Sequence, residues 1–212
     1  MTKNFKDIDS IIFDLDGTLW DSRKEVADSW SEIIKQYDYK RQDVSFQEIN
    51  DLMGKTIDEI EDILFPDIPK EKRTEILAKA CKHENEYLAK YGARLFDNLE
   101  DTLENLSKKY RLFIVSNCQT GYIEAFLNYY NLDKYFEDYE HPKKPETVKS
   151  DNIKLIAKRN NLKNPVYVGD TQGDANATKE AGLEFIYASY GFGNVEEYKY
   201  KIEKIEDLLD LV

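Results

Sequence analysis

The sequence predicts an α/β fold, a doubly wound parallel sheet that carries an all-helical insertion. Short runs of β-branched and aromatic residues recur along the chain, and each is typical of a buried strand because polar residues bound it. The runs are Ser10–Phe13, Arg111–Ser116, Pro165–Gly169 and Glu184–Ser189. Helical patterns lie between and beside the last three runs, and this alternation of strand and helix favours a parallel sheet. These helices are Thr120–Tyr130, Asp151–Asn161 and Asp174–Ala181.

One segment interrupts that alternation. From about Arg23 to Ala93 the sequence shows helical periodicity without a strand pattern. Helices are predicted at Arg23–Tyr37, Ser45–Met53, Thr56–Leu64 and Lys70–Tyr91, with breaks near Gly54, Pro66, Pro69 and Gly92. We therefore expect a core domain of residues 1–20 and 94–212, and an inserted helical domain of residues 21–93, which we call the cap.

The composition is that of a globular protein and argues against a nucleic-acid or membrane partner. Charged residues make up 34% of the chain, and there are only nine glycines and five prolines, so no low-complexity tract is present. The formal net charge of −12 disfavours attraction to nucleic acid or to anionic lipid. We expect a monomer or a weak homodimer.

The cysteines and the N-terminal sequence predict a cytoplasmic, soluble protein. Cys81 and Cys118 are too few for a disulfide framework and have no CxxC spacing. The first residues, MTKNFKDID, carry charges where a signal peptide has its apolar run, and no stretch approaches 18 apolar residues.

Polar side chains follow three of the predicted strands, at the edge of the sheet where open α/β proteins bind ligands. The first strand ends in FDLDGT, the second in VSN and a third in VGDTQGD. The residues concerned are Asp14, Asp16, Thr18, Ser116, Asn117, Asp170 and Asp174. If all of them face one crevice, four carboxylates meet there.

Such a cluster of carboxylates needs a positive partner. Two unit charges about 4 Å apart repel by roughly 4 kcal/mol at an effective dielectric constant near 20. Carboxylate oxygens without nearby histidine or thiolate ligands favour Mg²⁺, which needs few protein ligands. A Mg²⁺ site in turn suggests a phosphorylated substrate.

The three motifs, DLDGT, FIVSN and VGDTQGD, identify the chain as resembling the haloacid dehalogenase-like (HAD) hydrolases. Within them it is similar to the phosphoglycolate phosphatase-like members, which have a Rossmann-like core and an inserted helical cap. Each motif alone is weak, since a solvated turn or a helix N-terminus explains it equally well. Their order along the chain, at strand ends and with a helical insertion after the first, makes the signal specific.

The resemblance implies a role for each motif residue. Asp14 is the nucleophile that becomes an aspartyl phosphate, and Asp16 is the general acid and base. Mg²⁺ is held by the side chains of Asp14 and Asp170 and by the backbone carbonyl of Asp16, and Asp174 supports the metal site. Ser116 donates a hydrogen bond to the transferring phosphoryl group, where preorganised donors stabilise the transition state. Asn117, its neighbour, is a further substrate-binding residue.

The phosphate-binding lysine of the family is less clear, because the usual Lys-Pro-x-Pro pattern is replaced by HPKKPETVKSDNIKLI. Lys144 precedes a proline, as the pattern requires, but the second proline is missing. Lys149 lies two residues before Asp151, which we expect to be the N-cap of the next helix. The family lysine has the same distance from its helix, so we favour Lys149 over Lys144.

Substrate choice is expected to come from the cap. The turn at Met53–Thr56 resembles the specificity loop of capped members, and Lys55 is a candidate for binding a second anionic group, although an ordinary surface lysine is the simpler interpretation. Asp16 favours phosphoryl transfer over halide displacement. LWDSRKEV lacks the histidine of the mutases, so the resemblance favours a hydrolase.

The expected function is Mg²⁺-dependent hydrolysis of a small phosphorylated metabolite. Phosphoglycolate, another small phosphoester, a nucleoside monophosphate and pyrophosphate all stay open as substrates, as does a sugar phosphomutase activity. A receiver domain also carries an aspartyl phosphate at strand ends, but it needs neither Asp16 nor the insertion. A non-catalytic binding protein is disfavoured by the complete acidic set.

Overall fold

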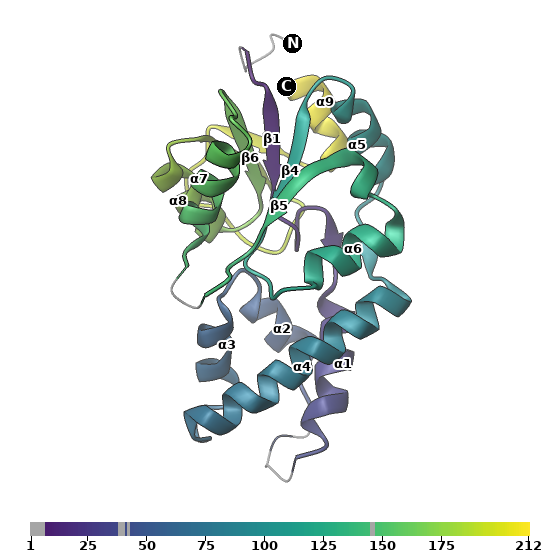
Figure 1. Cartoon of the computed structure of the whole chain (residues 1–212), viewed down its shortest axis with the longest axis vertical. Coiled ribbons are helices and arrows are strands. Elements are labelled where there is room, and N and C mark those ends of the chain that lie inside the picture. The colour runs from purple at the N-terminus through teal and green to yellow at the C-terminus, as the bar shows by residue number, and fades with distance from the viewer. Residues whose placement is uncertain (1–6, 38–40, 42, 145–146) are drawn as a thin grey trace.

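A parallel β-sheet lies at the centre of one half of the molecule (Figure 1). The computed structural model describes residues 7–37, 41, 43–144 and 147–212, so most of the charged N-terminal sequence lies outside the described residues. In the described chain the sheet has six strands in the order β5-β4-β1-β6-β7-β8. They are β1 (Ser10–Phe13), β4 (Arg111–Val115), β5 (Phe136–Glu140), β6 (Pro165–Gly169), β7 (Glu184–Ala188) and β8 (Tyr200–Ile202).

Helices cover both faces of this sheet (Figure 1). They are α5 (Leu99–Ser107), α6 (Tyr122–Tyr130), α7 (Lys149–Arg159), α8 (Gln172–Ala181) and α9 (Leu208–Leu211), with 3₁₀ turns at Asp133–Tyr135 and Ile205–Asp207. Strand β1 shows the two-sided burial, since Ile11 and Phe13 pack in one hydrophobic cluster and Ile12 in the other. The predicted α/β fold with a doubly wound parallel sheet is confirmed.

Four helices form the other half of the molecule (Figure 1). They are α1 (Arg23–Ile34), α2 (Phe46–Leu52), α3 (Ile57–Leu64) and α4 (Lys70–Tyr91). These helices enclose a hydrophobic cluster of their own, which includes Trp30, Ile49 and Leu77. The four helices predicted for the insertion are therefore present, whereas the domain limits of residues 20/21 and 93/94 stay a prediction.

Local sequence explains where the cap helices begin. Ser45 and Thr56 each accept a hydrogen bond from the backbone of the glutamate three residues later, and that glutamate binds back to the cap residue. Such a capping box satisfies two of the free N–H groups at a helix start.

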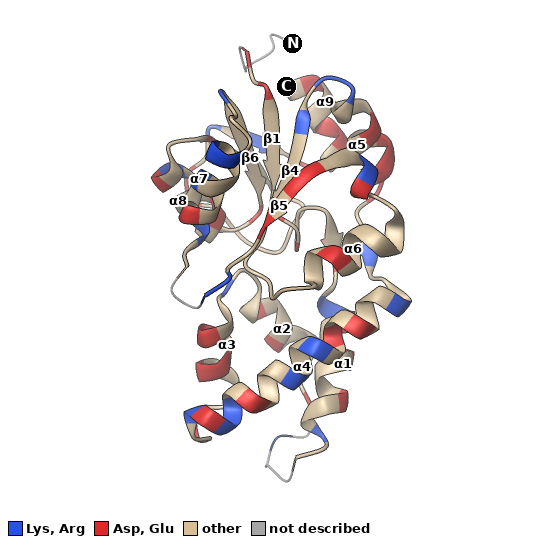
Figure 2. Cartoon of the chain, viewed as in Figure 1, with Lys and Arg blue, Asp and Glu red and all other residues tan. Residues whose placement is uncertain are grey.

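On the long helix α4, basic and acidic residues alternate along the exposed side (Figure 2), with ion pairs such as Lys79 to Glu75.

The cap is joined to the core by two short strands that pair with each other. Strand β2 (Trp20–Asp21) runs antiparallel to β3 (Arg94–Leu95), with Trp20 opposite Leu95 and Asp21 opposite Arg94. The chain therefore leaves the core and returns to it at the same place.

The sequence patterns do not predict β5, β8 or α5, nor the short elements β2, β3 and α9 and the two 3₁₀ turns. Strands β5 and β8 are the two edges of the sheet. An edge strand is partly exposed and carries charges that discourage further pairing, so it lacks the apolar run of a buried strand. The sequence of β5, FEDYE, is an example.

In the described residues no helix is both long and apolar enough to cross a membrane.

Candidate active site

The ends of three adjacent strands bring the predicted site residues together. Asp14 follows β1, Ser116 follows β4 and Asp170 follows β6, and β4, β1 and β6 are neighbours in the sheet. The backbone N–H of Asp14 donates to the carbonyl of Val168 at 2.8 Å, so the pairing with β6 continues one residue beyond β1. Parallel strands place their carboxyl ends at one edge, which is why these residues converge.

Three buried carboxylates form a compact cluster. Asp14, Asp170 and Asp174 each offer an oxygen, and these oxygens lie within 4.8 Å of one another. Lys149 lies among them, with its Nζ 2.5 Å from Asp14 Oδ1 and 2.5 Å from Asp174 Oδ1. The side chain of Asp16 belongs to a different set of contacts.

The position of Lys149 corrects one expectation. Helix α7 begins at Lys149 with Val148 as its N-cap, so the prediction of an N-cap at Asp151 is wrong. Asp151 lies in the first turn, where a carboxylate is stabilised by the helix dipole without capping the helix. A lysine at the first position opposes that dipole, and the ion pairs with Asp14 and Asp174 offset this cost.

Lys144 is placed differently from Lys149. It is exposed and lines an adjoining pocket together with Lys143 and Thr74. Lys149 is therefore the lysine beside Asp14, and its role toward a phosphoryl group stays a prediction.

Asp170 is held rigidly with one oxygen unused. Its Oδ2 accepts hydrogen bonds from the backbone N–H groups of Phe192 at 2.7 Å and Gly193 at 3.2 Å. Its Oδ1 is buried, and no donor in the described part of the chain reaches it. Gly17, at φ +83°, allows the close approach, because a Cβ there would lie 2.2 Å from Asp170 Oδ2.

These residues fit a hard divalent cation. The unused oxygen of Asp170 and the remaining oxygen of Asp14 are the ligand type that Mg²⁺ prefers. Asp174 is less free, because Lys149 occupies Oδ1 and Thr171 donates to Oδ2 from its backbone at 3.0 Å and its hydroxyl at 2.7 Å. Asp174 therefore supports the site mainly by holding Lys149.

Burial makes the cluster costly to ionise. It raises the pKa of Asp14 well above its usual range, with the charges of Asp174 and Asp170 adding to the rise and Lys149 opposing it. Burial and the neighbouring Asp174 raise the pKa of Asp170 to about 7. A cation bound between the two would lower both pKa values, because it favours the charged carboxylates.

Asp16 faces away from the cluster and is held at one oxygen. Its Oδ1 lies 2.6 Å from Ser22 Oγ, 2.8 Å from the Tyr122 hydroxyl and 2.9 Å from Trp20 Nε1. No donor in the described residues reaches its Oδ2. Burial raises the pKa of Asp16, although these three donors oppose the rise, and a raised pKa suits a group that gives up a proton.

The other predicted binding residues line the same cavity. Ser116 is buried beside the cluster, and its backbone N–H donates to the carbonyl of Glu140 at 3.2 Å. Asn117 donates from Nδ2 to the carbonyl of Gly54 at 3.2 Å, which ties the core to the α2–α3 loop of the cap. Lys55, next to Gly54, is half-buried and also lines the cavity.

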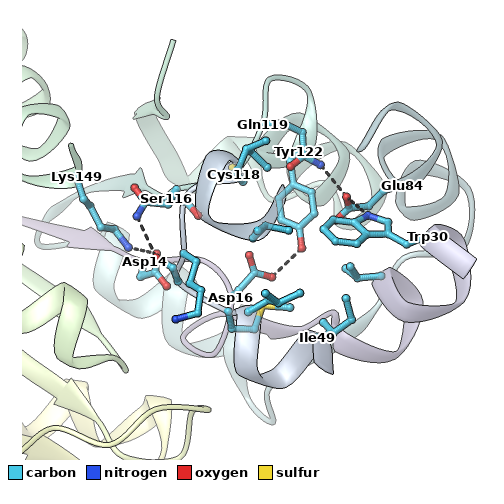
Figure 3. A pocket seen from close by; sticks show the side chains of 18 residues that line it. Asp14, Asp16, Trp30, Ile49, Glu84, Ser116, Cys118, Gln119, Tyr122 and Lys149 are labelled. Carbon is cyan, nitrogen blue, oxygen red and sulfur yellow. Dashed lines mark hydrogen bonds and ion pairs between the residues drawn. The ribbon is translucent and has the colours of Figure 1, made fainter. Parts of the chain in front are cut away.

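The cavity extends from the carboxylate cluster into the cap. Figure 3 shows Asp14 and Lys149 at one end, Glu84 and Trp30 at the other, and Asp16 with Tyr122 between them. The site thus joins a polar end on the core to an end enclosed by cap helices.

Comparison with known proteins agrees with this geometry. Residues 11–188 match the family model described as haloacid dehalogenase-like hydrolase. The chain belongs to the haloacid dehalogenase-like hydrolases. The hydrolase is 28% identical over 222 residues to phosphoglycolate phosphatase of Escherichia coli, covering 89% of this chain and 84% of that protein. It is 26% identical to pyrophosphatase PpaX of Bacillus mycoides, covering 97% of each.

Solved structures show the same fold. A predicted phosphoglycolate phosphatase from Haemophilus somnus superposes on this hydrolase with a TM-score of 0.84 at 21% identity, covering 98% of this chain and 99% of that chain. A haloacid dehalogenase-like family hydrolase from Streptococcus pneumoniae gives a TM-score of 0.80 at 25% identity, covering 96% and 97%.

Several residues that shape the site of this hydrolase were missed by the sequence reasoning. Trp20, Ser22 and Tyr122 hold Asp16, and Glu84 lies buried at the cap end. Trp20 and Ser22 lie close to Asp16 in sequence, so their contact with Asp16 could have been predicted from the LWDS segment. Nothing in the sequence pairs Tyr122 or Glu84 with the first motif, since both reach the site only through the fold.

Proposed function

We propose that this hydrolase is a Mg²⁺-dependent phosphatase that cleaves a small phosphate monoester through an aspartyl phosphate on Asp14. The observation that carries the proposal is the separation of two neighbouring carboxylates. Asp14 lies against Lys149 and Asp170, whereas Asp16 is held apart by three donors and keeps Oδ2 open to the cavity. One carboxylate is thus arranged for attack and the other for proton transfer.

In the first step a carboxylate oxygen of Asp14 attacks phosphorus in line with the leaving oxygen. The bond from phosphorus to the leaving oxygen breaks, and that oxygen takes the proton of Asp16. The product alcohol departs and Asp14 carries the phosphoryl group. Lys149 and Ser116 stabilise the negative charge of the phosphoryl oxygens.

In the second step Asp16, now ionised, takes a proton from a water molecule. The water oxygen attacks phosphorus, the bond to Asp14 breaks, and inorganic phosphate leaves. Asp14 and Asp16 return to their starting states. Mg²⁺, when bound by Asp14, Asp170 and the backbone carbonyl of Asp16, would neutralise charge on the transferring group.

The relatives support the reaction class rather than one substrate, because the similar proteins include both a phosphoglycolate phosphatase and a pyrophosphatase. A direct test is phosphate release from p-nitrophenyl phosphate and from a panel of small phosphorylated metabolites by purified protein, with and without Mg²⁺. We expect release that EDTA stops and added Mg²⁺ restores. Release that is equally fast in EDTA would contradict the proposal.

A further inference from the structure

The cap end of the cavity is apolar. We call it the cap chamber, and its apolar lining comes from α1, α2, α3 and the α2–α3 loop: Val26, Trp30, Ile49, Leu52, Met53, Ile57 and Ile60. The whole cavity has a volume of about 70 Å³. A single water molecule needs about 10–15 Å³ on the same measure, so the cavity has room for a phosphoryl group and a short leaving group.

One carboxyl group stands in this apolar chamber. Glu84, on α4, is 3% exposed, and its Oε2 accepts hydrogen bonds from Trp30 Nε1 at 2.7 Å and Gln119 Nε2 at 3.0 Å. No donor in the described part of the chain reaches its Oε1. Burial raises the pKa of Glu84 to about 8, with the charge of Asp16 adding to the rise and the Trp30 and Gln119 hydrogen bonds opposing it.

The lysines that line the cavity are at its core end, away from Glu84. Lys149 is paired with Asp14 and Asp174. Lys55 adjoins Gly54, whose carbonyl accepts a hydrogen bond from Asn117 and where a Cβ would lie 3.4 Å from Thr171 Cγ2, so the chain at Gly54 lies against the core end of the cavity. Among the described residues that line the cavity, the helices α1–α4 around Glu84 contribute no cationic side chain.

We propose that Glu84 recognises the far end of the leaving group and selects a short one that ends in a hydrogen-bond donor, an ammonium or a hydroxyl, over one that ends in an anion. The inference rests on the proposed function, since hydrolysis defines which part of the substrate leaves. The polar end of the substrate would lie at Asp14 and the leaving group would extend past Asp16 to Glu84.

The physical reason is the cost of unpaired groups in an apolar chamber. A carboxylate or phosphate placed there would lose its water and meet another acid without a cation to offset the loss. A bound ammonium would favour the ionised form of Glu84 and donate to its open oxygen, and a hydroxyl would hydrogen-bond to the same oxygen. A methyl group of the same size would leave that oxygen unpaired, and sites built for a polar partner discriminate strongly against such analogues.

Four phosphates with matched leaving groups test the proposal: 2-aminoethyl phosphate, 2-hydroxyethyl phosphate, propyl phosphate and phosphoglycolate. They differ mainly at the terminus that would face Glu84. We expect kcat/KM for each of the two donor compounds to exceed that for propyl phosphate by about tenfold or more, with phosphoglycolate the poorest. A kcat/KM for phosphoglycolate equal to or above the donor compounds would overturn the proposal.

Two matched variants separate recognition from packing. Glu84→Gln should lower the ratio of kcat/KM for 2-aminoethyl phosphate over propyl phosphate by about tenfold, because a bound ammonium favours the ionised form of Glu84 and an amide cannot ionise. Glu61→Gln is the control, since Glu61 is also a buried cap carboxylate, held by Thr74, but does not line the cap chamber. That ratio should be unchanged in Glu61→Gln, and an unchanged ratio in Glu84→Gln would overturn the assignment.

Binding measured in a variant that cannot turn over distinguishes failure of this inference from failure of the proposed function. If none of the four compounds nor p-nitrophenyl phosphate is hydrolysed, the proposed function fails. Calorimetric binding of the same four compounds to Asp14→Asn protein in Mg²⁺ then tests recognition alone. Donor compounds that bind about tenfold tighter than propyl phosphate would support the inference, and equal affinities or tighter phosphoglycolate would overturn it.

Discussion

The ammonium of Lys149 lies 2.5 Å from Asp14 Oδ1, although 135 positions separate the two residues in sequence. The same ammonium lies 2.5 Å from Asp174 Oδ1. Burial alone would lower the pKa of Lys149, but the charges of Asp14 and Asp174 raise it well above its usual range. The lysine is therefore held charged at the centre of the carboxylate cluster.

Replacing this lysine should lower the stability of the folded protein as well as its rate of phosphate release. Lys149→Met leaves Asp14 and Asp174 buried without their cation, and removing one partner of a buried ion pair costs about 3–5 kcal/mol. Urea unfolding in EDTA measures this loss. Lys144→Met, at an exposed position, should change stability by less than about 0.5 kcal/mol. A larger loss of phosphate release at Lys144 than at Lys149 would reverse the choice of lysine.

Asp14→Asn should remove turnover, since an amide cannot accept the phosphoryl group. We expect phosphate release to fall by about a thousandfold or more. Asp151→Asn is a suitable control, because Asp151 is exposed on the first turn of α7. Residual activity close to that of the wild type would remove Asp14 from the nucleophile role.

Asp16→Asn should separate the two steps. Without a general base the phosphoenzyme forms slowly and persists, and turnover should fall by about 10²–10⁴-fold. Mass spectrometry of the intact protein, quenched during reaction with p-nitrophenyl phosphate, would detect the phosphoryl group on the peptide that contains Asp14. Undiminished turnover would defeat the acid and base assignment.

Mg²⁺ should stabilise the folded protein through Asp170. A ligand at one hundred times its dissociation constant adds about 2.7 kcal/mol to the free energy of unfolding. Thermal unfolding with and without Mg²⁺ should show this gain in the wild type and in Asp210→Asn, a control at an exposed position on α9. Asp170→Asn should lose most of it, and an equal gain in that variant would exclude Asp170 as a ligand.

Glu84 should make stability depend on pH. Its pKa is raised from 4.5 to about 8 in the folded protein. The folded state therefore binds more protons than the unfolded state between these values, and stability falls as pH rises through them. The wild type should lose stability relative to Glu84→Gln between pH of about 5 and about 8. Denaturant unfolding of both proteins at several pH values gives the difference, and a flat or opposite trend would show that Glu84 is not buried as described.

The sheet and the polar ends of its central strands could be predicted because short stretches of sequence determine them. Buried parallel strands need continuous apolar runs, and the sequences before Asp14 and Asp170 have them. The order of those strands in a parallel sheet then determines that their carboxyl ends meet. Lys149, which the sequence favoured over Lys144, lies beside Asp14, but the N-cap of its helix is Val148, three residues before the expected cap at Asp151.

The cap side of the site could not be predicted, because it depends on contacts between distant helices. Glu84 stands in α4, a helix rich in Lys and Glu, and its neighbours gave no sign that it is buried. Its partner Trp30 lies 54 positions away, and Tyr122 lies 106 positions from Asp16. Helical periodicity indicates which face is apolar, but not which polar side chain is enclosed when four helices pack.

The pairing of β2 with β3 determines where this chain can vary. Because it leaves the core at Trp20–Asp21 and returns beside the same point at Arg94–Leu95, the intervening residues can change in length and sequence without moving a strand of the large sheet. Asp14 and Asp170 lie outside that interval, whereas Trp30 and Glu84 lie within it. Changes in that stretch of the gene can therefore remodel the end of the cavity that holds Trp30 and Glu84 while Asp14 and Asp170 stay in place.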